Sequence, residues 1–338
     1  MRFKNIFFAA AAAMALTACS SDDAIETVQQ QSQFPEDGVM RFTTNLVDPT
    51  IATTRASITG SDVNQNGQQF QVKIVNPTSA TYSYFNTVQY DGSEWTPLNR
   101  MLWQNDQQSI TVTAAYKQDK TFSDYEFIVG ANLTVAANQS TEAKLKQQDL
   151  LTMPTKTIAN PSIEETLMQN GKLVINFYHA LTKLDVTLEL KDEFFLSNQN
   201  TANISDVKIS GTNLGYNFKA METVNENYGT VTAAVTPVAD DILPMKGACT
   251  DATAASKHST ATYESIIVPQ QIAIGALIVS FKIGTRSFSW TNTQAYTLDQ
   301  GKLYTLPLTV GNDGVTAPAR GFSVSSWEDQ PGDNLGTE

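Results

Sequence analysis

Hydrophobic and polar residues alternate along most of the chain after about residue 37. The clearest case is the segment 183–190, in which Leu184, Val186, Leu188 and Leu190 are separated by single polar residues. A period of two predicts a β-strand with one buried face and one face in water. Because helical periodicity is scarce, the pattern predicts an all-β protein. The same alternation occurs in the segments 70–74, 110–116, 277–283 and 304–310.

One short helix is predicted near mid-chain, at residues 163–170. Ser162 and Glu165 have the spacing of a capping box, and Gly171 follows as a stop signal. Strand patterns precede and follow this segment, and 338 residues suffice for two domains of ordinary size. We therefore expect two antiparallel β-sandwich domains in tandem, one at residues 38–165 and one at residues 166–338.

The N-terminus has the layout of an export signal. Arg2 and Lys4 precede an apolar run at 6–16, and Thr17 and Ala18 stand directly before Cys19. An apolar residue, two small residues and a cysteine are what a lipoprotein signal peptidase reads, so residues 1–18 are predicted to be a lipoprotein signal peptide. Cys19 would become the lipidated N-terminus, and its acyl chains would anchor the protein. The alternative is an ordinary signal peptide cut near Ala18.

Residues 19–37 are predicted to form a flexible tether or propeptide. They are polar and rich in Gln, and they show no hydrophobic period. The Ser-Ser-Asp-Asp stretch at 20–23 resembles the surface-export signal of outer-membrane lipoproteins, although a charged tether would look similar. Together with Cys19, this segment predicts a location on the outer membrane, at the cell surface.

The charge and cysteine content exclude several classes of function. Removal of residues 1–18 leaves 20 of the 22 basic residues against 34 acidic ones, a net charge near −14. Such a surface repels phosphate backbones, so we expect no nucleic-acid partner. Lipidation of Cys19 leaves only Cys249, which cannot form an intramolecular disulfide. Cys249 and His258 lie in the polar segment 246–260, which is predicted to be a surface loop.

Residues that could carry catalysis or bind a metal are few. The chain has two histidines, His179 and His258, and lacks the metal-binding, nucleophile-elbow and phosphate-loop motifs. We expect no enzyme, metal or cofactor, although a carboxylate pair assembled by the fold stays open. Aromatic rings could instead stack on sugars, which would make the protein a glycan-binding surface lipoprotein, but tryptophan in a sandwich more often packs in the core. The candidates are Trp95, Trp103, Trp290 and Trp327.

Three local patterns resemble one protein family. The segment 42–57 is a strand followed by Thr-Thr-Arg-Ala-Ser. An aromatic run follows at 84–95, with further matches at 102–103 and 113–116. The most specific pattern is Asp-Leu-Leu at 149–151 together with 173–184, which contains Ile-Asn-Phe-Tyr-His-Ala-Leu-Thr-Lys-Leu. In this order they resemble the fimbrillin superfamily, the type V pilins that include FimA-like and Mfa-like proteins.

The resemblance implies a fold and a mode of assembly. It implies two transthyretin-like β-sandwiches in a structural subunit of a cell-surface pilus, at the shaft or the tip. In such pilins an arginine-specific protease removes the N-terminal segment of the lipidated precursor, and the vacated groove accepts a strand from another subunit. The implied partners are other pilin subunits, outer-membrane lipid through Cys19 before processing, and a host or bacterial surface ligand.

The resemblance also assigns residues to the processing step. The cut would fall between Arg55 and Ala56, in a small and polar segment, and Arg41 is a less accessible alternative because it lies inside a strand pattern. The other interpretation of Arg55 is a solvated loop arginine that is not cut. The displaced strand would bury Met40, Phe42 and Leu46. At roughly 1.5–3 kcal/mol for each large side chain, their removal leaves a vacancy of about 5–9 kcal/mol, which is an upper bound.

The C-terminal segment 321–327 is the candidate donor strand, with Phe322 and Val324 on one face. The alternative is an ordinary terminal strand that pairs within its own domain. That arrangement is the one expected of a tip subunit.

Overall fold

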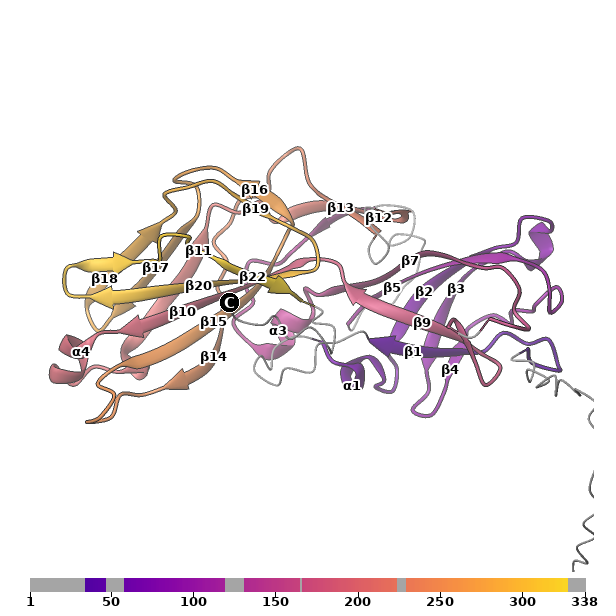
Figure 1. Ribbon diagram of the computed structural model, residues 1–338, viewed down its shortest axis with the longest axis horizontal. Helices are drawn as coiled ribbons and strands as arrows, with labels where there is room; N and C mark the ends of the chain where they lie inside the picture. The colour runs from indigo at the N-terminus through magenta and orange to yellow at the C-terminus, as the bar shows by residue number, and fades with distance from the viewer. Residues whose placement is uncertain (1–33, 47–57, 119–130, 165, 224–228, 328–338) are drawn as a thin grey trace, which may run out of the picture. The chain divides into compact units, whose positions relative to one another are not determined.

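The computed structural model describes residues 34–46, 58–118, 131–164, 166–223 and 229–327 (Figure 1). Strands make up most of these residues, which confirms the all-β class. None of the helices in the described ranges is long and apolar enough to cross a bilayer. The helical segments are all short: α1 (Gly60–Val63), α3 (Glu142–Lys146), α4 (Asp192–Leu196) and two 3₁₀ turns, η1 (Ala80–Tyr82) and η2 (Thr201–Asn203).

The first sheet contains eight strands, and the pairing of β9 with β1 closes its order into a ring. The last long strand, β9, pairs with the first strand, β1, in parallel, and every other ladder of this sheet is antiparallel. One face of the sheet encloses an apolar core that includes Phe70, Val72, Ile74 and Phe177. The order is β1 (Phe42–Leu46), β4 (Trp95–Pro97), β3 (Tyr84–Tyr90), β2 (Gln69–Val75), β5 (Ile110–Lys117), β7 (Leu150–Ile158), β9 (Lys172–His179) and β8 (Met168–Gln169).

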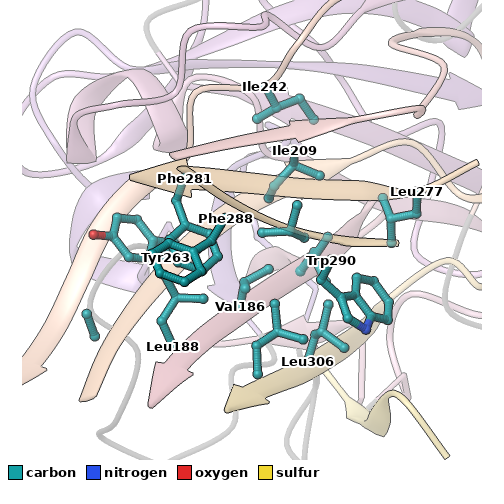
Figure 2. Packing of buried hydrophobic residues seen from close by; sticks show 14 of the residues in the cluster. Val186, Leu188, Ile209, Ile242, Tyr263, Leu277, Phe281, Phe288, Trp290 and Leu306 are labelled. Atoms are coloured by element: carbon teal, nitrogen blue, oxygen red, sulfur yellow. The ribbon is translucent and has the colours of Figure 1, made fainter. Parts of the chain in front are cut away.

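A second sheet and a three-stranded sheet pack face to face around another apolar core. Figure 2 shows Val186, Leu188 and Leu306 of the second sheet opposite Phe281 and Trp290 of the three-stranded sheet. The second sheet contains β14 (Met245–Thr250), β15 (Ser259–Ile267), β10 (Thr182–Leu190), β20 (Lys302–Gly311), β21 (Gly314–Thr316) and β22 (Ser323–Ser326). The three-stranded sheet contains β11 (Ile204–Ser210), β17 (Ile278–Ile283) and β18 (Arg286–Thr291).

Two smaller sheets complete the fold. The sheet of β13 (Gly229–Ala233), β12 (Gly215–Thr223) and β6 (Ala131–Thr134) joins a strand from the first half of the chain to strands from the second. The last sheet pairs β16 (Gln270–Ile272) with β19 (Tyr296–Leu298).

The helix predicted at 163–170 is wrong. Met168–Gln169 and the start of β9 form a hairpin instead, and its turn residues Asn170 and Gly171 have φ angles of 51° and 73°. Positive φ at both central positions is what a two-residue hairpin turn requires, and Asn-Gly is the sequence that adopts it most readily. Gly171 is therefore a turn residue and not a helix stop.

The chain passes from the first sheet to the second between His179 and Thr182. The strands β8 and β9 belong to the first sheet, and β10 belongs to the second. This change of sheet lies C-terminal to the domain boundary predicted at 165/166. The predicted boundary relied on the helix predicted at 163–170 as the connection between two sets of strands.

Two predictions about polar residues also differ from the structure. The predicted loop at 246–260 contains most of β14 and the start of β15, which form a hairpin with an exposed edge strand that carries Cys249.

Alternation in β10 correctly predicts the buried row that begins at Leu184. Its other face, however, is not in water, since Lys183 and Asp185 are 1% and 4% exposed. The cross-strand partner of Lys183 is Ile266, which packs in a third apolar cluster that covers this face.

A buried group of three charges lies on the covered face of β10. Lys183 Nζ is 2.8 Å from Glu264 Oε2 and 3.9 Å from Asp185 Oδ1. Burial raises the pKa of Asp185 to about 7, Lys183 opposes this rise, and Glu264 adds to it. The protonated form of Asp185 is therefore favoured in the folded chain relative to the unfolded chain, whose aspartate has a pKa near 3.8.

This raised pKa predicts a pH-dependent effect of Asp185→Asn. The contribution of Asp185 to the free energy of unfolding is greatest below about pH 4 and is lost as the pH rises through 7. This contribution should therefore fall by about 2–3 kcal/mol between pH 5 and pH 8. The neutral amide introduced by the substitution lacks this titration. Urea unfolding at both pH values should therefore show a smaller decrease for the variant than for the native chain, and an unchanged decrease would contradict the assignment.

Candidate functional site: strand β1 and its neighbours

The segment that contains β1 pairs with two different parts of the first sheet. At its start, the Met40 amide donates to the Met101 carbonyl at 3.0 Å, and the Trp103 amide donates to the Gly38 carbonyl at 2.9 Å. From Phe42 to Leu46 the strand forms a parallel ladder with β9. On its other side it meets β4 only at the pair Phe42–Trp95, so among the described strands most of β1 has a single ladder.

The inward side chains of this segment fill the apolar core of the first sheet. Met40 and Phe42 are 1% and 2% exposed, and Leu46 is half-buried against the same cluster. The Phe42 ring meets the Phe70 ring edge to face, with centroids 6.0 Å apart. Phe70 in turn lies 4.8 Å from the Trp95 ring, so Phe42 completes an aromatic cluster. The core therefore depends on residues from a short strand close to the N-terminus of the folded body.

One inward position of β1 is polar. Trp95 Nε1 donates to Thr44 Oγ1 at 3.1 Å and to Asn64 Oδ1 at 2.8 Å, and the Thr44 hydroxyl donates to Asn64 Oδ1 at 2.9 Å. Sequence reasoning named Met40, Phe42 and Leu46 but missed Thr44. Its place two residues after Phe42, on the same face of the strand, is the signal that could have found it. We call the neighbours of β1, namely β9, Phe70, Trp95 and Asn64, the β1 site.

The residues predicted to be processed lie mostly outside the described ranges. This applies to Cys19, Arg55 and Ala56, whereas the alternative cut at Arg41 is within them. Arg41 Nη1 donates to Asp37 Oδ1 at 2.9 Å, and this bond holds the pKa of the Asp37 carboxyl well below its usual range. The Arg41 carbonyl accepts from the Leu173 amide at 2.8 Å, so its backbone is part of the β-structure.

Comparison with known proteins identifies the family. The sequence model of the family described as fimbrillin-like matches residues 54–327, which is most of the chain. The chain therefore belongs to the fimbrillin-like family. The search of curated proteins found no match.

Solved structures share the fold of this fimbrillin-like protein. One is a candidate cell adhesion protein from Bacteroides uniformis, with 15% sequence identity and a TM-score of 0.54. The match covers 87% of this chain and 99% of the Bacteroides uniformis chain. Another is a candidate cell adhesion protein from Bacteroides ovatus, with 14% sequence identity and a TM-score of 0.56. This match covers 86% of this chain and 98% of the Bacteroides ovatus chain. At these identities the likeness concerns the fold alone.

The C-terminal strand of the fimbrillin-like chain is paired within its own sheet. The strand β22 forms an antiparallel ladder with β20. Phe322, just before β22, is buried, and its ring lies edge to face against Tyr296 and Tyr304. Val324, two residues later, is 54% exposed.

The last described residue, Trp327, contacts two separate segments of the fold. Its ring stacks on the His179 ring at the end of β9, with centroids 4.4 Å apart and planes 5° from parallel. Its amide donates to the Gly301 carbonyl at 2.9 Å. His179 Nδ1 lies 2.8 Å from Asp149 Oδ2, and both side chains are fully buried. His179 is thus a structural residue in this fold, as its position at a strand end predicted.

The second histidine, His258, lies at the protein surface. Its ring nitrogens lie 2.6 Å from Glu189 Oε1 and 2.8 Å from Asp192 Oδ1. The bond to Glu189 raises the pKa of His258, and the charge of Asp192 adds to this effect.

The tryptophans considered for sugar binding are buried. Trp95, Trp103, Trp290 and Trp327 are 5%, 5%, 8% and 4% exposed. A stacking platform needs an open ring face, so none of the four is positioned to stack on a sugar. Their burial agrees with the packing role that tryptophan usually has in a sandwich.

Proposed function

We propose that this protein is a structural subunit of a cell-surface fimbria and that β1 is the strand exchanged during assembly. In this proposal Cys19 anchors the lipidated precursor to the outer membrane, and an arginine-specific protease cuts between Arg55 and Ala56. The vacated β1 site then accepts a strand from another pilin subunit. Membership of the fimbrillin-like family supports a fimbrial and adhesive role, with a structural and not a catalytic activity.

The burial of Phe42 on a strand with one main ladder is the observation that carries the proposal. Phe42 and Met40 belong to the core, and β1 ends at residue 46, a few residues before Arg55. Loss of the segment would expose the apolar surface of the first sheet and the unpaired edge of β9. An incoming strand would restore both the main-chain hydrogen bonds and the side-chain burial.

A tip position is favoured over a shaft position. A shaft subunit must accept a strand and also donate one, and the C-terminal segment is the candidate donor. Here β22 is paired with β20, and Trp327 is buried against His179. A subunit that accepts a strand and keeps its own C-terminal strand would end the polymer.

The processing step predicts a defined product. Treatment of the lipidated precursor with an arginine-specific protease should yield a chain that begins at Ala56. After addition of neighbouring subunits, this chain should enter detergent-resistant, heat-sensitive complexes on gels. Arg55→Gln should block both results, and Arg41→Gln should leave the new N-terminus at Ala56. A precursor that resists cleavage, or a product that stays monomeric with its neighbours, would contradict the proposal.

A further inference from the structure

The inward row of β1 is chemically mixed, and this row defines what any replacement strand must supply. Met40 and Phe42 are buried in the apolar core, Thr44 is hydrogen-bonded, and Leu46 packs at the edge of the core. The four positions therefore read apolar, aromatic, hydroxyl, apolar at every second residue. In a strand that fills a purely hydrophobic groove, all four inward residues would be apolar, whereas the third inward residue of β1 is polar.

The hydroxyl position is contacted by two side chains, one from strand β4 and one from the residue that follows α1. The Trp95 ring is buried and presents its only hydrogen-bond donor, Nε1–H, to Thr44 Oγ1. Asn64, the C-cap residue of α1, accepts from both Trp95 and the Thr44 hydroxyl. A strand with valine at this position would match the shape of threonine, but it would lose both hydrogen bonds and place a methyl group against two polar groups.

The aromatic position is equally specific in shape. Phe42 meets Phe70 edge to face, and Phe70 also contacts Phe177 at a centroid distance of 5.6 Å. A smaller side chain would leave part of this cluster unfilled. We infer that Trp95, Asn64 and Phe70 select a donor strand in which an aromatic residue is followed two positions later by a serine or threonine. This inference rests on the proposed strand exchange.

The protein's own C-terminal strand does not fit this rule. Along the segment 321–327 one row contains Phe322, Val324 and Ser326, and the other contains Ser323, Ser325 and Trp327. Neither row has an aromatic residue followed two positions later by a hydroxyl residue. The rule therefore excludes the segment 321–327 of a second copy of this chain as the donor.

Peptide exchange into the protease-treated protein tests this rule. After cleavage and inhibition of the protease, labelled peptides with the sequence of residues 38–47 are added, and their affinities are measured by fluorescence anisotropy. Thr44→Ser should bind about as well as the native peptide. Thr44→Val should bind about 3-fold to 10-fold more weakly, because both hydrogen bonds of the hydroxyl are lost while Trp95 Nε1 keeps its bond to Asn64 Oδ1. Thr43→Val, on the outward face, is the matched control and should bind as the native peptide does.

Two further arms connect the effect to the residues named above. In the Trp95→Phe protein the penalty for Thr44→Val should shrink, because the indole donor is gone while the aromatic ring remains. A peptide of residues 319–328 should bind at least about 10-fold more weakly than the native peptide, because it lacks the aromatic and hydroxyl pair. Equal affinities of the Thr44→Val and Thr44→Ser peptides, or strong binding of the C-terminal peptide, would overturn the rule while leaving strand exchange intact. Failure of the native peptide to bind would overturn both.

Discussion

Phe42→Ala is expected to lower the free energy of unfolding by about 3–5 kcal/mol, the cost of removing a fully buried phenylalanine from a packed core. Phe42 is 2% exposed and touches the ring of Phe70, which itself lies against Trp95 and Phe177. The deletion would therefore leave a cavity beside the Phe70 ring, and a rigid sheet cannot close such a cavity fully. Urea unfolding of the uncleaved chain would measure the loss.

Thr43→Ala is the matched control for this change. Thr43 is the neighbouring residue in β1, points to the other face of the strand and is only partly buried. Its replacement should cost less than about 1 kcal/mol. A loss of similar size for both variants would show that the effect comes from the strand as a whole and not from the burial of Phe42.

Lys183→Met is expected to cause a similar loss, about 3–5 kcal/mol near pH 8, because it removes the cation from a buried group with two carboxyls. Lys183 is 1% exposed and lies 2.8 Å from Glu264. Without the lysine, Asp185 and Glu264 would face each other across paired strands as like charges. Thermal or urea unfolding at two pH values would measure the effect.

The pH dependence of Lys183→Met follows from the same charges. Lys183 lowers the pKa of Asp185, which burial raises to about 7, so its removal should raise that pKa further. Protonation of Asp185 then relieves the repulsion as the pH falls, and the loss at pH 5 should be smaller than at pH 8. Lys208→Met is the control, because the ion pair of Lys208 with Asp241 is exposed and should contribute less than about 1 kcal/mol.

The proposed assembly makes opposite demands on the two ends of the folded body. The β1 segment must be stable in the precursor and removable after a single cut, which suits a short strand with one main ladder. The C-terminal strand is held by a ladder to β20, by the buried Phe322 and by the stacked pair of Trp327 and His179. In this proposal, an exchangeable N-terminal strand combined with a fixed C-terminal strand distinguishes a subunit that only accepts a strand from one that also donates a strand.

Local pattern correctly predicted many strands but did not predict which strands pair. Alternation identified β10, β17 and β20 because side chains of a strand point to opposite faces whatever the strand pairs with. It predicted a water-facing side for β10, where Lys183 and Asp185 are in fact buried. That burial arises from the packing of a distant segment around Val135 and Leu145 over Ile266, and no local pattern records such a contact.

The sequence by itself determined the export signal pattern, the all-β class, the family resemblance and the importance of Phe42 as an inward residue. Each of these depends on residue order over a few positions. Only the tertiary structure decided that β1 pairs in parallel with β9, that Thr44 meets Trp95 and Asn64, and that Trp327 stacks on His179. These contacts join residues far apart in the chain, and strand pairing depends on the packing of the whole sheet, so their geometry exists only after the chain has folded.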